Sequence, residues 1–133
     1  MTVSELINNI YAKWREAISQ TPVKNNYSME NSTVVAKLPA ATLFFQGLPT
    51  SDSDLMGAEA SVTPTVQVDI YTKGQKALTQ AYQIDEVSHS VLNGVYGFRR
   101  SYGPELIQST DPSIKRLTSR YTRLFGLGDK LPE

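Results

Sequence analysis

The stretch from Thr63 to Gly126 constrains the fold most, because its hydrophobic pattern changes period within a few residues. Val66, Val68 and Ile70 alternate with polar or amphipathic residues, and this period of two is typical of a strand with one buried face. After a turn, apolar residues recur at every third or fourth position, which predicts a helix packed on the sheet. This stripe comprises Ala77, Leu78, Ala81, Ile84, Val87, Val91 and Leu92. A strand followed so closely by a helix predicts an α+β layer.

Two more strands are expected after this helix, which Asn93-Gly94 should end. The first begins at Gly97 to Arg100 and is expected to be interrupted at Tyr102-Gly103-Pro104, because glycine and proline mark turns. The last extends from Ile114 to Phe125. This part of the chain therefore predicts at least three strands and one helix.

The N-terminal half predicts a second helix and another strand. Thr2 and Glu5 have the spacing of a capping box, and the apolar stripe that follows predicts a helix from about Val3 to Ser19. Residues Ala40 to Gln46 are apolar on both alternating faces, which indicates a central strand covered on both sides. Val34-Val35 can add a short edge strand.

These elements predict a single α+β domain over residues 1–126, because 133 residues suffice for one core and are too few for two. We expect a mixed or mainly antiparallel sheet of about four strands, with two helices packed on one face. Residues 127–133 contain two glycines and a proline, so we expect a flexible tail that orders only against a partner.

Composition excludes several kinds of function. The chain has no cysteine, so it has no disulfides, no thiolate nucleophile and no cysteine zinc site. Met1 to Glu5 lacks the start of a secretory signal, and no apolar run is long enough to cross a bilayer. We therefore expect a soluble, unexported protein without a membrane partner.

The formal net charge is zero, but the charges are segregated along the chain. The segment from Ser51 to Thr72 has a charge of −4, and the segment from Arg99 to Phe125 has a charge of +4. Such a protein can bind copies of itself, acidic patch to basic patch, because charge complementarity sets register and partner choice. Solvated faces that happen to segregate are the alternative.

The last strand has one apolar and one polar face, as does the strand around Asp69. Leu117, Ser119 and Tyr121 alternate with Arg116, Thr118 and Arg120. The polar face matches Gln67, Asp69 and Tyr71 on the earlier strand, so opposite charges can meet across the sheet. A solvated sheet face is the alternative explanation.

The sequence contains few candidates for a catalytic or cofactor-binding site. His89, the only histidine, falls beside Asp85 or Glu86 on the predicted second helix. A hydrogen-bonded or solvated histidine is far commoner there than a general base. The sequence has no metal-ligand cluster, phosphate-binding glycine loop, dinucleotide fingerprint or nucleophile motif, so we expect no cofactor and no enzymatic activity.

The strand at 67–74, the helix after it, and the strands containing Gly97-Phe98-Arg99-Arg100 and Arg116 to Tyr121 resemble the tail terminator or tail completion proteins of long-tailed bacteriophages. The resemblance covers about half of the chain. It implies a structural virion protein that forms a ring, usually of six subunits, and caps the head-proximal end of the tail tube. The implied partners are other copies of the chain, the major tail tube protein and the head connector, with DNA passing only through the lumen.

The resemblance also implies the location of the subunit contacts. In this family the polar sheet face helps to build the ring, so its candidate residues here are Gln67, Asp69, Tyr71, Arg116 and Arg120. The implied location is the tail neck of the virion, reached after assembly in the host cytoplasm. The resemblance implies that the ring closes without a chemical reaction. Guanidinium groups can form ion pairs with carboxylates of the same or a neighbouring subunit.

The connection from Leu48 to Pro64 is a second candidate, for docking to the tube or connector. It is long and acidic, and we expect it to be mobile in the free protein and to order against a neighbouring subunit or the tube. The residues that would dock are Asp52, Asp54, Leu55, Met56 and Glu59. An ordinary hairpin loop is the alternative.

Two other classes of function remain open. One is nucleic-acid binding by the basic C-terminal strands, with arginines on phosphates and tyrosines stacked on bases. Its candidates are Arg99, Arg100, Arg116, Arg120, Arg123, Tyr96, Tyr102 and Tyr121. The other is a small enzyme or ligand-binding domain, which requires an apolar pocket with convergent polar groups.

Overall fold

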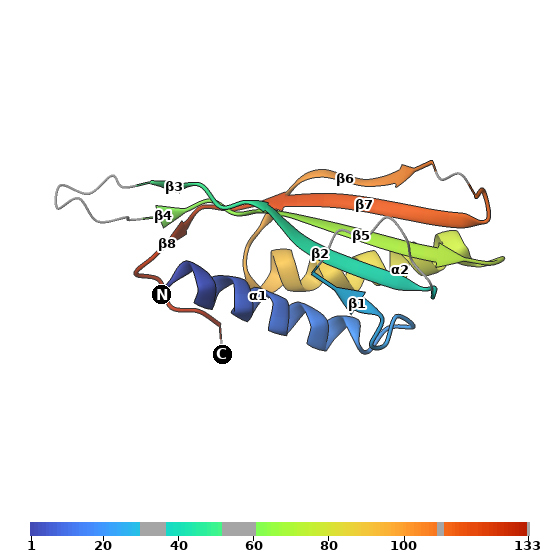
Figure 1. Cartoon of the computed structure of the whole chain (residues 1–133), viewed down its shortest axis with the longest axis horizontal. Coiled ribbons are helices and arrows are strands. Elements are labelled where there is room, and N and C mark those ends of the chain that lie inside the picture. Colours follow the sequence, from blue (N-terminus) through green and yellow to red (C-terminus); the bar gives the residue numbers. More distant parts are fainter. Residues whose placement is uncertain (30–36, 52–60, 109–110, 133) are drawn as a thin grey trace.

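The computed structural model describes residues 1–29, 37–51, 61–108 and 111–132. They form two helices beneath a five-stranded mixed sheet in the order β1-β2-β5-β7-β6, and a small second sheet in the order β3-β4-β8 (Figure 1). The strands are β1 (Tyr27–Ser28), β2 (Ala40–Gly47), β3 (Thr50–Ser51), β4 (Ser61–Val62), β5 (Thr65–Lys73), β6 (Arg99–Ile107), β7 (Ile114–Thr122) and β8 (Phe125–Gly126). The helices are α1 (Val3–Ile18), α2 (Ala77–His89) and a π-helical continuation, η1 (Ser90–Val95). The α+β class and the two helices on one face were correctly predicted.

The strand count and the sheet pattern differ from the prediction. β2, β5, β7 and β6 are antiparallel neighbours, as expected, but β1 adds a fifth strand parallel to β2. β1, β3, β4 and β8 are two residues long, which is too short to leave a periodic pattern in the sequence. β2 was placed centrally, whereas β5 is the middle strand. The predicted edge strand at Val34-Val35 lies outside the described residues.

Helix α1 begins at the predicted capping box. Thr2 Oγ1 accepts a hydrogen bond from the Glu5 amide at 3.1 Å, and Glu5 Oε2 accepts one from the Thr2 amide at 3.3 Å. Leu6, Ile10 and Trp14 are fully buried against the sheet and α2. Trp14 Nε1 donates to Ser88 Oγ at 2.9 Å, which connects α1 to α2 inside the core.

The predicted interruption of β6 is wrong. The strand continues through Tyr102, Gly103 and Pro104 as an edge strand with two register shifts against β7. Gly103 has φ +84°, and a Cβ on it would lie 2.3 Å from the Thr118 carbonyl oxygen. A β-bulge therefore accommodates within the strand the residues that were expected to end it.

The C-terminal part of the chain leaves the main sheet earlier than predicted. β7 ends at Thr122, and the following residues form β8, which pairs with β4. Leu127 and Leu131 pack against the core, and the Met1 amino group donates to the Leu127 carbonyl oxygen at 2.7 Å. The expectation of a tail that orders only against a partner is therefore corrected for residues 127–132, which contact their own domain.

Candidate functional site

The face of the main sheet that points away from α1 and α2, called here the outer face, carries a hydrogen-bonded polar cluster. Its members are Gln46 on β2, Gln67, Asp69 and Tyr71 on β5, Tyr102 on β6, and Arg116, Thr118 and Arg120 on β7. The register pairs Gln67 with Arg120, Asp69 with Thr118 and Tyr71 with Arg116. All five residues predicted for the sheet face therefore lie together, as their alternation on two strands indicated.

Asp69 is the centre of this cluster and is 0% exposed. Its carboxylate accepts hydrogen bonds from Thr118 Oγ1 at 2.7 Å, from an Arg116 guanidinium nitrogen at 3.2 Å and from Gln67 Nε2 at 3.1 Å. A buried carboxylate is tolerated only when it is paired and hydrogen-bonded in this way. The Arg116 side chain remains a third exposed, so the pair reaches the surface.

Arg120 reaches Asp69 only through Gln67. Its Nε donates to Gln67 Oε1 at 3.0 Å, and Gln46 Nε2 donates to the same oxygen at 2.7 Å. The Arg120 guanidinium also lies 5.0 Å from the centre of the Tyr102 ring, a cation–π contact on the exposed edge of the sheet. The opposite charges that meet across the sheet are therefore those of Asp69 and Arg116, and not those of Asp69 and Arg120.

Tyr71 completes the cluster beside Arg116, whose guanidinium lies 5.8 Å from the ring centre. Burial raises the pKa of the Tyr71 hydroxyl, and the nearby Asp69 carboxylate raises it further. The hydroxyl therefore remains protonated at neutral pH and can donate a hydrogen bond.

Two buried polar atoms in this region have no hydrogen-bond partner within the part of the chain that the structure describes: Thr42 Oγ1 and Arg116 Nε. Thr42 lies opposite Asp69 on the neighbouring strand β2, so both atoms flank the central carboxylate. Buried polar atoms are nearly always paired with protein groups or water. The cluster therefore has hydrogen-bonding capacity that its own side chains leave unused.

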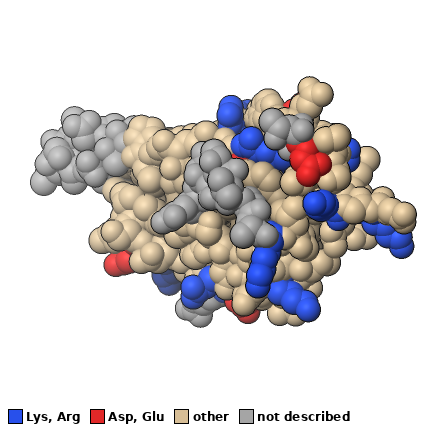
Figure 2. Space-filling model, turned by 45° about the vertical axis from the view of Figure 1, so that its right-hand side comes forward, with Lys and Arg blue, Asp and Glu red and all other residues tan. Residues whose placement is uncertain are grey.

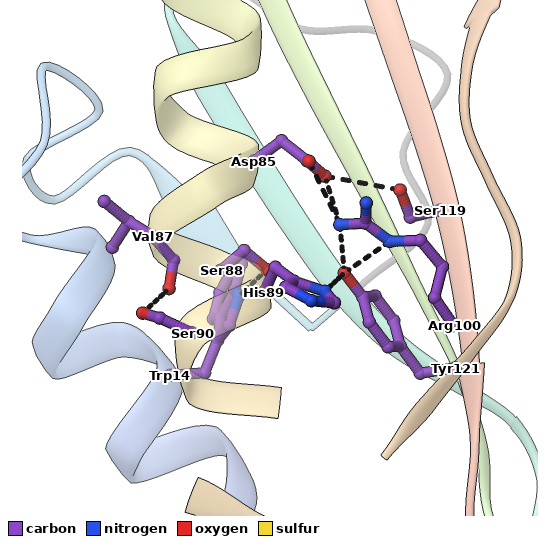
Figure 3. A network of polar contacts seen from close by, with 9 residues as sticks. All are labelled: Trp14, Asp85, Val87, Ser88, His89, Ser90, Arg100, Ser119 and Tyr121. Atoms are coloured by element: carbon purple, nitrogen blue, oxygen red, sulfur yellow. Dashed lines mark hydrogen bonds and ion pairs between the residues drawn. The ribbon is translucent and has the colours of Figure 1, made fainter. Parts of the chain in front are cut away.

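A second polar cluster lies on the other side of the sheet, between α2, β6 and β7 (Figure 3). Arg100 donates to both Asp85 carboxylate oxygens at 3.1 and 3.0 Å, and its Nε donates to the Tyr121 hydroxyl at 3.0 Å. Ser119 Oγ donates to Asp85 at 3.3 Å, and His89 Nδ1 lies 3.1 Å from the Tyr121 hydroxyl. This cluster joins the edge strand β6 to helix α2.

The side chains of this second cluster stabilise the fold. Burial raises the pKa of Tyr121 to about 12, so its hydroxyl stays protonated. Burial and the neighbouring Arg100 lower the pKa of His89, with Asp85 opposing them. His89 is thus a neutral, hydrogen-bonded histidine, as expected. The cluster itself was missed, although the alternation on β7 had already placed Ser119 and Tyr121 on the buried face.

The arginines and tyrosines that are candidates for nucleic-acid binding are divided between the two sides of the sheet. Tyr96 and Tyr121 are buried and cannot stack on bases. Arg100 is held by Asp85, and Arg123 donates to the Tyr96 carbonyl oxygen. Only Arg99, Arg116, Arg120 and Tyr102 belong to the outer face by their register.

A cavity of about 240 Å³ lies between the ends of β6 and β7. Its described lining is Leu106, Ile107, Gln108, Pro112, Ile114 and Lys115. Lys115 is the only charged residue among them, so the convergent polar groups that a catalytic or ligand pocket needs are missing from this lining. Within the described part of the chain, no three His, Asp or Glu side chains gather to hold a metal ion.

The predicted docking residues Asp52, Asp54, Leu55, Met56 and Glu59 lie outside the described residues. The chain on either side of them is described, and β3 pairs antiparallel with β4 as Thr50 with Val62 and Ser51 with Ser61. These strands lie at the end of the molecule farthest from the turn between β5 and α2 (Figure 1). No helix in the described ranges is long and apolar enough to cross a bilayer.

Neither a protein-family model nor a curated protein sequence matches this chain.

Proposed function

We propose that this chain is a structural subunit of a bacteriophage virion, which forms a ring and caps the head-proximal end of the tail tube. The ring is hexameric, as in the tail completion family that the sequence resembles. It ends tube growth and joins the tail to the head connector in the neck of the virion, after assembly in the host cytoplasm. This role involves no cofactor, no membrane and no catalysis, and DNA meets the ring only as it passes through the lumen.

The outer face is the main observation that supports this proposal. It is an ordered polar cluster on the side of the sheet away from both described helices, and Thr42 Oγ1 and Arg116 Nε there have no hydrogen-bond partner among the described residues. Arg120 is exposed, and Tyr102 is 38% exposed beside it. Arginine and tyrosine are enriched where protein surfaces bind each other, because they combine apolar area with hydrogen-bonding groups. Such a surface suits contact with another subunit better than reaction with a small substrate.

The mechanism that we propose is geometric. A ring with cyclic symmetry joins one surface of each copy to a different surface of the next, and it closes when the rotation per subunit divides the circle. A closed ring on the tube end then occupies the positions that the next tube subunits would take. Binding alone ends growth, and the opposite side of the ring is left to bind the connector.

Tube assembly in vitro tests the function directly. The major tail protein encoded beside this gene is polymerised with and without the chain, and tube lengths and ends are observed by electron microscopy. We expect a ring at one end of each tube and no further growth there. Tubes of unchanged length without end density, or a gene neighbourhood lacking tail and connector proteins, would contradict the proposal.

Charge reversal of Arg120 tests the role of the outer face. Arg120→Glu should weaken ring formation while changing the unfolding free energy by no more than about 1 kcal/mol, because the side chain is exposed. Arg15→Glu is the matched control, because Arg15 is an exposed arginine on α1, on the opposite side of the sheet. Equal ring formation by both variants would exclude the outer face from the contact.

Nucleic-acid binding is the alternative that the same protein preparation can test. A titration with a single-stranded oligonucleotide at increasing salt should show weak binding, because only part of the basic set shares one face. Tight binding with a steep salt dependence, and no self-assembly, would favour that alternative over the ring.

A further inference from the structure

Lysines gather at one end of the molecule, where β5 passes into α2, opposite to the end with β3 and β4 (Figure 1). Lys73 ends β5, and Lys76 directly precedes α2. The pairing of Thr72 with Lys115 brings the start of β7 to the same end. Figure 2, in which this end is turned forward, shows Lys and Arg side chains at several places on it.

Two further lysines come from the N-terminal half of the chain. Ala40 pairs with Tyr71, so Lys37, just before β2, also lies toward the end of β5. The Asn26 side-chain amide donates to the Lys37 carbonyl oxygen at 2.8 Å, which places the turn that contains Lys24 beside it. The whole set is called here the basic end, and its members are Lys24, Lys37, Lys73, Lys76 and Lys115.

The basic end carries an excess of positive charge at the surface. Four of its lysines are exposed, Lys115 is partly exposed, and none of the five forms an ion pair with a described carboxylate. Asp69 is fully buried and is paired with Arg116. Asp111 lies close enough to Lys73 for the two charges to interact, and it offsets only part of the excess. Clustered exposed charges of one sign attract an oppositely charged partner over about 10 Å at moderate salt.

The predominance of lysine favours a phosphate backbone as this partner. Lysine is depleted where protein surfaces bind each other, whereas arginine and aromatic residues are enriched there. A lysine ammonium group is a point charge on a flexible stem, and it binds phosphates without a fixed geometry. Duplex DNA carries one negative charge per about 1.7 Å of its axis, so clustered cations bind it whatever its sequence.

We infer that the basic end binds the phosphate backbone of double-stranded DNA in the lumen of the ring. The inference rests on the ring proposed above and adds the surface that meets the DNA. Because the outer face runs along the strands, subunits that meet through it can all direct the same end toward the ring axis. Contacts from several copies then add up on one duplex, and they let the DNA slide because phosphates carry no sequence information.

Two double variants of the full chain, equal in net charge, test this contact. One carries Lys73→Glu and Lys76→Glu. Its control carries Arg99→Glu and Lys130→Glu, because these exposed residues lie outside the basic end, at the start of β6 and near the C-terminus. Circular dichroism checks that both variants are folded, and fluorescence anisotropy measures their binding to a short labelled duplex between about 0.05 and 0.2 M salt.

The wild type should bind the duplex with a slope of log affinity against log salt of about −3 to −4, at about −0.9 for each phosphate contacted. Reversal of Lys73 and Lys76 should weaken binding at least about tenfold at the lowest salt and reduce the size of the slope by about 2. The control variant should bind within about threefold of the wild type, because its residues do not contact the duplex. Both variants should still cap tail tubes, which are polymerised without DNA in the assembly test above.

The outcomes separate this inference from the proposed function. No binding by the wild type at the lowest salt, equal loss in both variants, or a preference for single-stranded over duplex DNA would overturn the contact and leave the ring standing. Loss of capping with unchanged duplex binding, after reversal of Lys73 and Lys76, would also overturn it, by assigning the basic end to a protein partner. Duplex binding that depends on these lysines, in a wild type that caps no tubes, would support the contact and contradict the proposed function.

Discussion

At the scale of single residues, the outer face depends on Asp69 because this carboxylate is completely buried. Removing one member of a fully buried ion pair leaves the other charge unpaired, and this costs about 3–5 kcal/mol. The cost should be smaller here, because the Arg116 side chain is a third exposed. We expect Asp69→Ala to lower the unfolding free energy by about 2–4 kcal/mol in urea denaturation. Arg120→Ala should lower it by about 1 kcal/mol or less.

A double-mutant cycle distinguishes the two arginines as partners of Asp69. Combining Asp69→Asn with Arg116→Gln should give a coupling energy above about 1 kcal/mol, because the groups lie 3.2 Å apart. Combining Asp69→Asn with Arg120→Gln should give about 0.5 kcal/mol or less, because only Gln67 connects them. Equal coupling in both cycles would contradict the contacts of the outer face.

Gly103 gives a prediction that depends on backbone geometry alone. Its φ is positive, and an added Cβ would collide with the Thr118 carbonyl oxygen, so Gly103→Ala should destabilise the fold by about 2 kcal/mol or more. Gly94→Ala is the control, because nothing lies within 4 Å of a Cβ built there, and its effect should be within about 1 kcal/mol of zero. Thermal denaturation of both variants checks the contrast.

At the scale of elements, strand β6 is an edge strand held to α2 by the cluster of Asp85, Arg100 and Tyr121. Tyr121→Phe removes the hydroxyl that binds both Arg100 and His89, and leaves the partly buried Arg100 with fewer partners. We expect a loss of about 1–2 kcal/mol and faster amide exchange in β6 than in β5. Uniformly faster exchange across the whole sheet would show that the cluster does not act on β6 in particular.

His89 makes the stability of this junction sensitive to pH. The pKa of His89 in the folded protein lies below its ordinary value of about 6.5, so the unfolded chain binds a proton first as pH falls. The free energy of unfolding should therefore be highest above pH 6.5 and should decrease as pH falls from there to the folded pKa. Because His89 is the only histidine, His89→Gln should flatten the profile between pH 7 and pH 5.5, where other side chains titrate little. An unchanged slope in His89→Gln would assign the effect elsewhere.

For the molecule as a whole, the two termini lie near each other, with the C-terminal residues beside the first part of α1 (Figure 1). Asn9 Nδ2 donates to the Pro132 carbonyl oxygen at 3.0 Å, and Leu127 and Leu131 pack against the core. Deleting residues 127–133 should therefore lower the unfolding free energy by about 2 kcal/mol or more, from lost apolar burial. A truncated chain with wild-type stability, measured in urea, would support the flexible tail that composition alone predicts.

The elements whose pattern is local and repeated can be predicted from the sequence. Helices α1 and α2, strands β5 and β7, and the two faces of each strand follow from periods of 3.6 and 2, which are set by residues within one or two turns. The same alternation brought Gln67, Asp69, Arg116 and Arg120 to one face. The capping box at Thr2 is likewise a contact between near neighbours.

The features that join residues far apart in the chain depend on the folded structure. The choice of Arg116 over Arg120 as the partner of Asp69 depends on where two strands come into register. The passage of β6 through Gly103 depends on a β7 carbonyl oxygen, and the short strands β1, β3, β4 and β8 exist only because a neighbour pairs with them. Residues 127–132 are held by α1 and the core, 118 or more positions away from Asn9 in the chain. Such contacts leave no periodic trace in sequence, because their energy comes from groups that only folding brings together.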